Sequence, residues 1–311
     1  MSVEKVSEEN SNIEGSRDAL EHYKESVPGL HHVKSLPLIP VVKEDNIRNL
    51  QDMEIRDDDV LVAGYPKSGT HWLEEILSLL FGQQNGKKLR MHSIDFVPSL
   101  TTKENDDLLP MISNLPSPRV LATHLPYEYM PPGVKAGKCK TICIVRNPKD
   151  VAVSYFHYHK NTNALGLYDG SWEQFLEVFH KGEVVLGDWY EHVLSWWLHA
   201  KDSNIHFCCF EDMKKHPQKE IERLAAFLDK PVSEEITKGI AKATNFDKMR
   251  RTAKNNQGVC IFDQSIPKFM RKGKVGDWKN YFTVSQNEKF DKHHSNKIGD
   301  IGIHIPFEIN H

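Results

Sequence analysis

The chain has 311 residues, of which 40 are Lys or Arg and 43 are Asp or Glu, so its formal net charge is −3. A charge balance this close to neutral argues against a protein that binds nucleic acid through its overall charge. The hydrophobic fraction of 39% and the charged fraction of 27% are those of a globular chain, and they argue against a largely disordered or fibrous protein.

The first residues of the chain, its apolar runs and its cysteines indicate the cellular compartment and whether a metal is bound. The first 18 residues are polar, and we expect residues 1–18 to form a disordered tail before a single domain over residues 19–311. They hold no apolar core of a secretory signal, and no apolar run elsewhere is long enough to span a membrane. The five cysteines favour reduced thiols, and no Cys or His pairs have zinc-site spacing. We therefore expect a cytoplasmic protein without a metal.

Four short apolar segments are typical of strands that are buried on both faces. These expected strands cover residues 59–65, 119–124, 140–145 and 205–210. Helical segments separate them, and strands that alternate with helices predict βαβ units. We expect an α/β fold, a single domain with a central, mainly parallel sheet of about five strands flanked by helices.

Helix signals lie between and after the strands. Apolar residues recur at helical spacing over 71–81, and Gly82 is a typical stop. A second helix is expected over 148–160, with Asn147 as N-cap and Pro148 in its first position. Three further helix starts are indicated by capping-box-like pairs, which are Ser171 with Gln174, Asp188 with Glu191, and Ser285 with Glu288.

Basic side chains follow the expected strands at the points where they end. Residues 66–70 (PKSGT) follow the first strand, His124 ends the second, and Arg146 follows the third. Open parallel sheets bind ligands outside the C-terminal ends of their strands. The sequence therefore predicts a cationic rim at one edge of the sheet, suited to an anionic ligand.

Residues 65–72 (YPKSGTHW) join a strand to a helix. Backbone N–H groups at a helix start bind phosphate-like groups, Gly69 permits close backbone approach, and Lys67 adds a charge. The segment is not the GxxxxGK[ST] phosphate loop, because its lysine precedes the glycine. An ordinary strand-to-helix turn with an exposed lysine is the alternative at this point.

Three segments together resemble the cytosolic sulfotransferases. Residues 65–72 resemble the family's P-loop-like 5′-phosphosulfate loop, and residues 146–160 (RNPKDVAVSYFHYHK) resemble its 3′-phosphate segment. Residues 269–283 (FMRKGKVGDWKNYFT) resemble its second nucleotide segment. The resemblance implies an enzyme that transfers a sulfuryl group from 3′-phosphoadenosine 5′-phosphosulfate (PAPS) to a hydroxyl or amine of a small lipophilic acceptor. The product would be 3′-phosphoadenosine 5′-phosphate (PAP), and no metal takes part.

The resemblance also implies roles for individual residues. His124 would be the general base, and Lys67 would stabilise the leaving phosphate. The implied PAPS-binding residues are Lys67, Ser68, Gly69, Thr70, His71, Trp72, Arg146, Ser154, Phe210, Thr244, Phe246, Arg271, Lys272 and Gly273. Among them, Trp72 is the expected adenine platform, and Thr244 and Phe246 match further adenine-contacting positions. The 3′-phosphate would be anchored by Arg146, Ser154 and Arg271.

Fewer residues of the sequence indicate the acceptor pocket and the oligomeric state. Tyr155 and Tyr158 match positions that line the family's acceptor pocket, and we expect residues 36–42 and 96–98 to contribute to it. The family's dimer motif is matched by Lys279, Thr283, Val284 and Glu288, which implies a small homodimer contact.

Three positions depart from the family's pattern. Ala122 stands in place of a lysine, Phe210 in place of a tyrosine, and His71 in place of the second loop threonine. We hypothesise that a protonated His71 touches the sulfuryl or phosphate oxygens and partly replaces the lost lysine. The departures leave open a catalytically weak protein that binds nucleotide or a small lipophile on the same fold. A kinase fits poorly, because no clear acidic residue is available for Mg²⁺.

Overall fold

The computed structural model describes residues 18–85, 90–95, 108–255, 271–299, 301–303 and 305–308. The expected tail at 1–18 lies outside this part of the chain except for Asp18, which already belongs to a helix that covers residues 18–26. Residues 96–98, expected near the acceptor, and the first two residues of the 269–283 segment also lie outside it.

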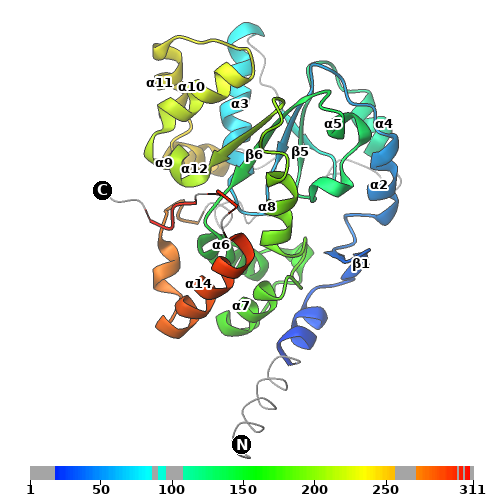
Figure 1. Ribbon diagram of the computed structural model, residues 1–311, viewed down its shortest axis with the longest axis vertical. Helices are drawn as coiled ribbons and strands as arrows, with labels where there is room; N and C mark the ends of the chain where they lie inside the picture. Colours follow the sequence, from blue (N-terminus) through cyan, green and yellow to red (C-terminus); the bar gives the residue numbers. More distant parts are fainter. Residues whose placement is uncertain are drawn as a thin grey trace, which may run out of the picture.

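A parallel sheet of five strands forms the centre of the molecule (Figure 1). Its strands are β3 (Val60–Ala63), β4 (Met91–Ser93), β5 (Val120–Thr123), β6 (Lys140–Val145) and β7 (Ile205–Cys209). They are hydrogen-bonded in the order β4-β5-β3-β6-β7, and every neighbouring pair is parallel. This confirms the expected α/β class, the four expected strands and the number of strands.

Side chains of the central strands alternate between two apolar layers, because successive residues of a strand point to opposite faces. Val60 and Val62 pack with α3 and α10 on one face, whereas Leu61 and Ala63 belong to the larger cluster on the other face. All four are buried. Neither face of a strand buried in this way is exposed to solvent, so its sequence is continuously apolar.

A short antiparallel hairpin precedes the sheet. It pairs β1 (His31–Val33) with β2 (Leu36–Leu38). All three residues of β2 are buried, and Leu36 and Leu38 belong to the larger core cluster. Part of the 36–42 segment therefore packs in the core.

Helices cover both faces and the C-terminal edge of the sheet. Their bounds are α2 (Glu44–Asn49), α3 (Thr70–Asn85), α4 (Leu108–Ser113), α5 (Pro132–Lys135), α6 (Pro148–Asn161), α7 (Trp172–His180), α8 (Trp189–Trp197), α9 (Phe210–Lys215), α10 (Pro217–Phe227), α11 (Glu234–Ala243), α12 (Phe246–Asn255) and α14 (Val284–Ile298). In Figure 1, α3 and α9–α11 lie on one side of the sheet, and α2, α4 and α5 on the other. Helices α6, α7 and α14 are grouped below it. No helix within the described ranges has the length and apolar character needed to cross a bilayer.

Most of the expected helix starts are confirmed. Asn147 caps α6 by accepting a hydrogen bond from the backbone N–H of Lys149 at 2.9 Å. Ser171 forms a complete capping box with Gln174, and the Asp188 side chain caps α8.

Two helix boundaries were predicted wrongly. The start of α14 is not the expected pair Ser285 and Glu288, because Thr283 forms a capping box with Gln286. Both patterns fit the capping rule, and the structure uses the earlier one, so the helix begins two residues sooner than expected. Gly82 does not end α3, which continues to Asn85. A glycine within a helix costs only about 1 kcal/mol relative to alanine, so it need not end one.

Candidate active site and nucleotide site

Four strand ends bring the sequence motifs to one edge of the sheet. Strands β5, β3, β6 and β7 are consecutive neighbours, and all four are parallel. His124, the 64–70 loop, Arg146 and Phe210 follow them directly, in the same spatial order. Residues from four distant parts of the sequence therefore meet at the C-terminal edge, as expected.

The 64–70 loop combines two residues of positive φ with two buried hydroxyls. Lys67 and Gly69 have positive φ angles of 70° and 115°. A Cβ at Gly69 would lie 2.9 Å from Cδ2 of Phe210, so a larger residue does not fit there. The hydroxyls of Ser68 and Thr70 are buried, and neither has a hydrogen-bond partner among the described residues. Buried hydroxyls without partners are costly, and these two are available to hydrogen-bond a ligand.

Arg146 connects this loop with the neighbouring strand ends. Its guanidinium donates to the backbone carbonyl of Lys67 at 2.9 Å and lies 4.3 Å from the ring centroid of Phe210. Its Nε is buried without a hydrogen-bond partner in the described part of the chain. Burial lowers the pKa of Arg146 below its ordinary value, yet a guanidinium stays charged at neutral pH. The side chain is thus a fixed cation with an unused donor.

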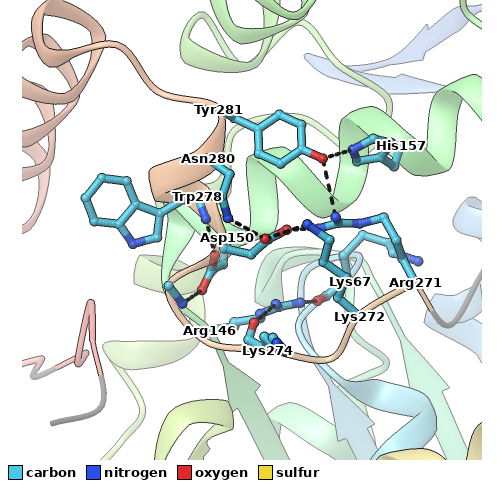
Figure 2. Close-up of polar contacts among 12 residues, drawn as sticks. Lys67, Arg146, Asp150, His157, Arg271, Lys272, Lys274, Trp278, Asn280 and Tyr281 are labelled. Atoms are coloured by element: carbon cyan, nitrogen blue, oxygen red, sulfur yellow. Dashed lines mark hydrogen bonds and ion pairs between the residues drawn. The ribbon is translucent and has the colours of Figure 1, made fainter.

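The 271–281 loop adds further cations, shown in Figure 2. Arg271 and Lys272 both donate to Asp277, at 2.6 and 2.7 Å. Burial raises the pKa of Asp277, but these two hydrogen bonds outweigh it and hold the pKa below the ordinary value. The hydroxyl of Tyr281 lies 3.4 Å from Nη1 of Arg271 and 2.7 Å from Nε2 of His157. Arginine only donates, so the tyrosine oxygen accepts from Arg271.

Helix α6 holds this loop in place. Asp150 accepts hydrogen bonds from the backbone N–H groups of Gly276 and Trp278, at 2.7 and 2.9 Å (Figure 2). Asp150 lies four residues after Arg146, so one short segment carries the buried arginine and fixes the loop that carries Arg271.

Aromatic side chains and one lysine lie together at the expected adenine position. The rings of Trp72 and Phe210 meet edge to face at 5.5 Å. Nζ of Lys214 lies 5.6 Å from the Trp72 ring and 5.9 Å from the Phe246 ring. Burial lowers the pKa of Lys214, and the nearby Arg146 lowers it further. A Cβ at Gly273 would lie 2.2 Å from the Phe246 ring, so glycine permits this contact. Lys214 belongs to this group, although the sequence analysis did not select it.

Two other expected nucleotide-binding residues, Thr244 and Ser154, lie outside this aromatic group. Thr244 is buried, and its hydroxyl donates to the backbone carbonyl of Ile240 at 3.0 Å. Ser154 lies half-buried on α6, two turns after Arg146.

His124 is held in one tautomer by the end of the neighbouring strand. Its Nδ1 lies 2.5 Å from the carbonyl oxygen of Gly64, and a carbonyl only accepts, so Nδ1 carries the proton. Nε2 of the neutral ring therefore has a free lone pair. Burial lowers the pKa of His124 to about 4, the hydrogen bond to Gly64 opposes this shift, and the charges of His71 and Lys67 add to it. The ring is neutral at physiological pH.

A buried aspartate fixes the backbone of the same histidine. Asp95 accepts from the Thr123 hydroxyl and from the His124 backbone N–H, both at 2.6 Å. Burial raises the pKa of Asp95 to about 7 despite these hydrogen bonds. The sequence analysis missed Asp95, because a single aspartate 29 residues before its partner follows no spacing rule.

The two expected acceptor tyrosines differ in position. Tyr155 is fully buried, and its hydroxyl donates to the backbone carbonyl of Val185 at 2.8 Å. Tyr158 is half-buried and lies beside it, and Nζ of Lys67 lies 4.2 Å from the Tyr158 ring centroid. Tyr158 is therefore the one of the pair that contacts the loop lysine.

The four residues of the expected dimer motif lie near the surface. Lys279 pairs with Glu308 at 2.6 Å, and Thr283 caps α14. Val284 is 76% exposed, and Glu288 is also exposed.

Comparison with known proteins identifies the family of the chain. Residues 57–302 match the family of sulfotransferase domains. The chain belongs to this family. Sulfotransferase 1C2 of Rattus norvegicus is 36% identical over 297 residues, which are 90% of this chain and 96% of the relative. The expected family, enzyme class and fold are confirmed.

Solved structures agree with this assignment. Mouse sulfotransferase SULT7A1, solved in complex with PAP, superimposes with a TM-score of 0.78 at 36% identity, and 87% of this chain and 94% of that chain are covered. A retinol dehydratase in complex with retinol and PAP has a TM-score of 0.80 at 26% identity, with coverage of 94% and 96%.

Proposed function

We propose that this sulfotransferase moves the sulfuryl group of PAPS to a hydroxyl or amine of a small lipophilic acceptor, with His124 as the general base. The carrying observation is the neutral ring of His124, whose Nδ1 is fixed on Gly64 and whose Nε2 is free to accept a proton. It stands beside the 64–70 loop, whose buried hydroxyls have no partner among the described residues.

The donor site has the groups that a doubly phosphorylated nucleotide requires. Ser68 and Thr70 would bind the 5′-phosphosulfate, together with backbone N–H groups at the start of α3. Arg146 and Arg271 would bind the 3′-phosphate, because a guanidinium matches phosphate geometry. Trp72 offers a face for adenine. The PAP-bound relatives support this choice of nucleotide.

In this proposal the chain contributes two functions to the reaction: His124 accepts a proton, and Lys67 stabilises a negative charge. As the acceptor oxygen or nitrogen bonds to sulfur, its proton moves to Nε2 of His124, and the Gly64 carbonyl stabilises the resulting imidazolium. The bond between sulfur and the phosphate oxygen breaks, and PAP leaves with the electron pair. Lys67 stabilises the negative charge that grows on that oxygen.

The pH dependence of transfer follows from the environment of His124. Its pKa is lowered to about 4, so its base form is complete at neutral pH and is lost as the pH falls through 4. We expect kcat/KM for the acceptor to stay near its maximum down to about pH 5 and to decrease at lower pH values. A profile that loses half its value near the ordinary histidine pKa of about 6.5 contradicts this assignment.

A second test concerns the hypothesis that His71 partly replaces the lysine that the family has at the position of Ala122. Ala122 lies in β5 and is buried, whereas His71 is exposed and pairs with Glu74 at 3.2 Å. If a protonated His71 contributes to catalysis, His71→Thr should lower kcat most at low pH, so that the ratio of wild-type to variant kcat falls as the pH rises from 5.5 to 8. A ratio that is constant with pH counts against the role of His71.

The acceptor is proposed at the level of its chemical class. Tyr158 offers an aromatic surface beside Lys67. The relative that holds retinol, an apolar alcohol, supports an acceptor that joins a hydroxyl to a lipophilic body. The exposed Val284, with Lys279, Thr283 and Glu288, is retained as the proposed homodimer contact.

A catalytically weak nucleotide- or lipophile-binding protein is the second candidate. The alanine at position 122 favours it, since losing one electrostatic contact to a transition state costs about 100-fold in rate.

A further inference from the structure

The C-terminal residues 305–308 contact both halves of the proposed 3′-phosphate site. The carbonyl oxygen of Phe307 accepts one hydrogen bond from Nδ2 of Asn147 and one from Nε1 of Trp278, both at 3.2 Å. Asn147 directly follows Arg146, and Trp278 belongs to the same loop as Arg271. One carbonyl group therefore links the two segments that carry the arginines.

Asn147 uses all of its polar groups in this arrangement. Its backbone N–H donates to Glu211 at 3.1 Å, and its Oδ1 caps α6. The residue is fully buried, so its side-chain amide must find an acceptor inside the protein. Phe307 supplies that acceptor, and loss of the carbonyl leaves a buried donor unpaired next to Arg146.

A buried lysine and α14 hold the C-terminal residues in place. Nζ of Lys149 lies 5.0 Å from the Phe307 ring and 4.3 Å from the Trp278 ring. Lys149 also bonds to Asn287 and Asp291 of α14, both at 2.5 Å. In Figure 1, the red end of the chain runs close to α6 and α14. The position of the Phe307 carbonyl is thus fixed by packing on several sides.

We infer that residues 305–308 position the nucleotide site, with the Phe307 carbonyl holding the Arg146 segment and the 271–278 loop at the spacing that a 3′-phosphate requires. This inference rests on the proposed PAPS-dependent function. It assigns to the C-terminal residues a specific effect on the 3′-phosphate, and it gives them no contact with the nucleotide itself.

Two shortened chains test the inference. A chain that ends at Pro306 lacks the acceptor carbonyl, whereas a control chain that ends at Glu308 keeps it. Calorimetric titration with PAP and with adenosine 5′-phosphate, which differs only by the missing 3′-phosphate, measures both affinities. The chain ending at Pro306 loses the two hydrogen bonds to the Phe307 carbonyl, the contact of the Phe307 ring with Lys149, and the ion pair of Glu308 with Lys279. We expect it to bind PAP about tenfold more weakly than the control and to bind adenosine 5′-phosphate within about twofold of the control. Equal losses for both nucleotides, or no loss for either, overturn the inference.

Trp278→Phe repeats the test without shortening the chain. It removes the Nε1 donor and keeps an aromatic ring next to Lys149, so the preference for PAP over adenosine 5′-phosphate should fall about threefold to fivefold. An unchanged preference contradicts the inference even if the shorter chain does not fold. If the full chain itself fails to prefer PAP over adenosine 5′-phosphate, the proposed function is wrong, and the inference falls with it. If the full chain prefers PAP and the variants keep that preference, the inference alone is wrong.

Discussion

Replacing His124 with alanine is expected to reduce sulfuryl transfer by about 10²- to 10⁴-fold at pH 7, because a positioned general base contributes about that much to a rate. PAP binding should stay within about threefold, since the nucleotide groups belong to other strand ends. The measurement is steady-state transfer from labelled PAPS, with PAP affinity determined separately. His32→Ala is the matched control, because His32 is exposed on the β1–β2 hairpin.

His124→Asn separates loss of the base from loss of packing. The amide nitrogen of asparagine is as many bonds from Cβ as Nδ1 of histidine, so it is able to donate to the Gly64 carbonyl, but it does not take up a proton at neutral pH. We expect this variant to be as inactive as the alanine variant and closer to wild type in thermal stability. A His124→Asn protein with more than a tenth of native turnover rules out His124 as the base.

Replacing Lys67 with methionine is the second change with a large expected effect. Methionine keeps the length of the side chain and removes its charge, so the negative charge on the leaving phosphate loses its cation. We expect kcat to fall about 10²- to 10³-fold, with a smaller change in KM for PAPS.

A lysine of the same backbone conformation serves as the control. Lys34 has a φ angle of 56°, close to the 70° of Lys67, and its Nζ lies 5.3 Å from the Tyr129 ring. It lies in the turn of the β1–β2 hairpin and does not follow any strand of the central sheet, so Lys34→Met should leave kcat unchanged. If the two variants lose similar activity, the loss is not specific to Lys67 and the assigned role is wrong. If Lys67→Met changes only KM, Lys67 binds the donor without stabilising the leaving group.

The fold was predictable where local sequence decides structure. All residues of β3 and β5 are buried, and so are those of β6 after Lys140, so their sequences are mostly apolar. Strand β7 lies at the edge of the sheet, and its apolar run is interrupted only by the half-buried His206. Strand β4 has only three residues, MHS, none of them buried, and its pairing with β5 alone defines it. The start of α14 was missed for another reason, because two overlapping pairs of residues fit the capping rule and the structure uses the first of them, Thr283 with Gln286.

The site was predictable where one continuous segment carries it. The loop at 64–70, the start of α6 and the 271–281 loop each hold their key residues within a few positions. The groups that fix these residues come from far away in the chain, for example His157 to Tyr281 across 124 positions and Asn147 to Phe307 across 160. Folding alone creates such pairs, and no spacing rule marks them.

The central claim is that this chain transfers a sulfuryl group and that His124 takes the acceptor's proton. The most direct measurement follows labelled sulfate from PAPS to a mixed panel of phenols, steroid alcohols and aryl amines, with wild type and His124→Ala run side by side and PAP-induced thermal stabilisation recorded for both. The account predicts labelled product from wild type, no detectable product from the variant, and stabilisation of both proteins by PAP. Stabilisation by PAP without transfer to any acceptor contradicts the catalytic claim and favours a binding protein on the sulfotransferase fold.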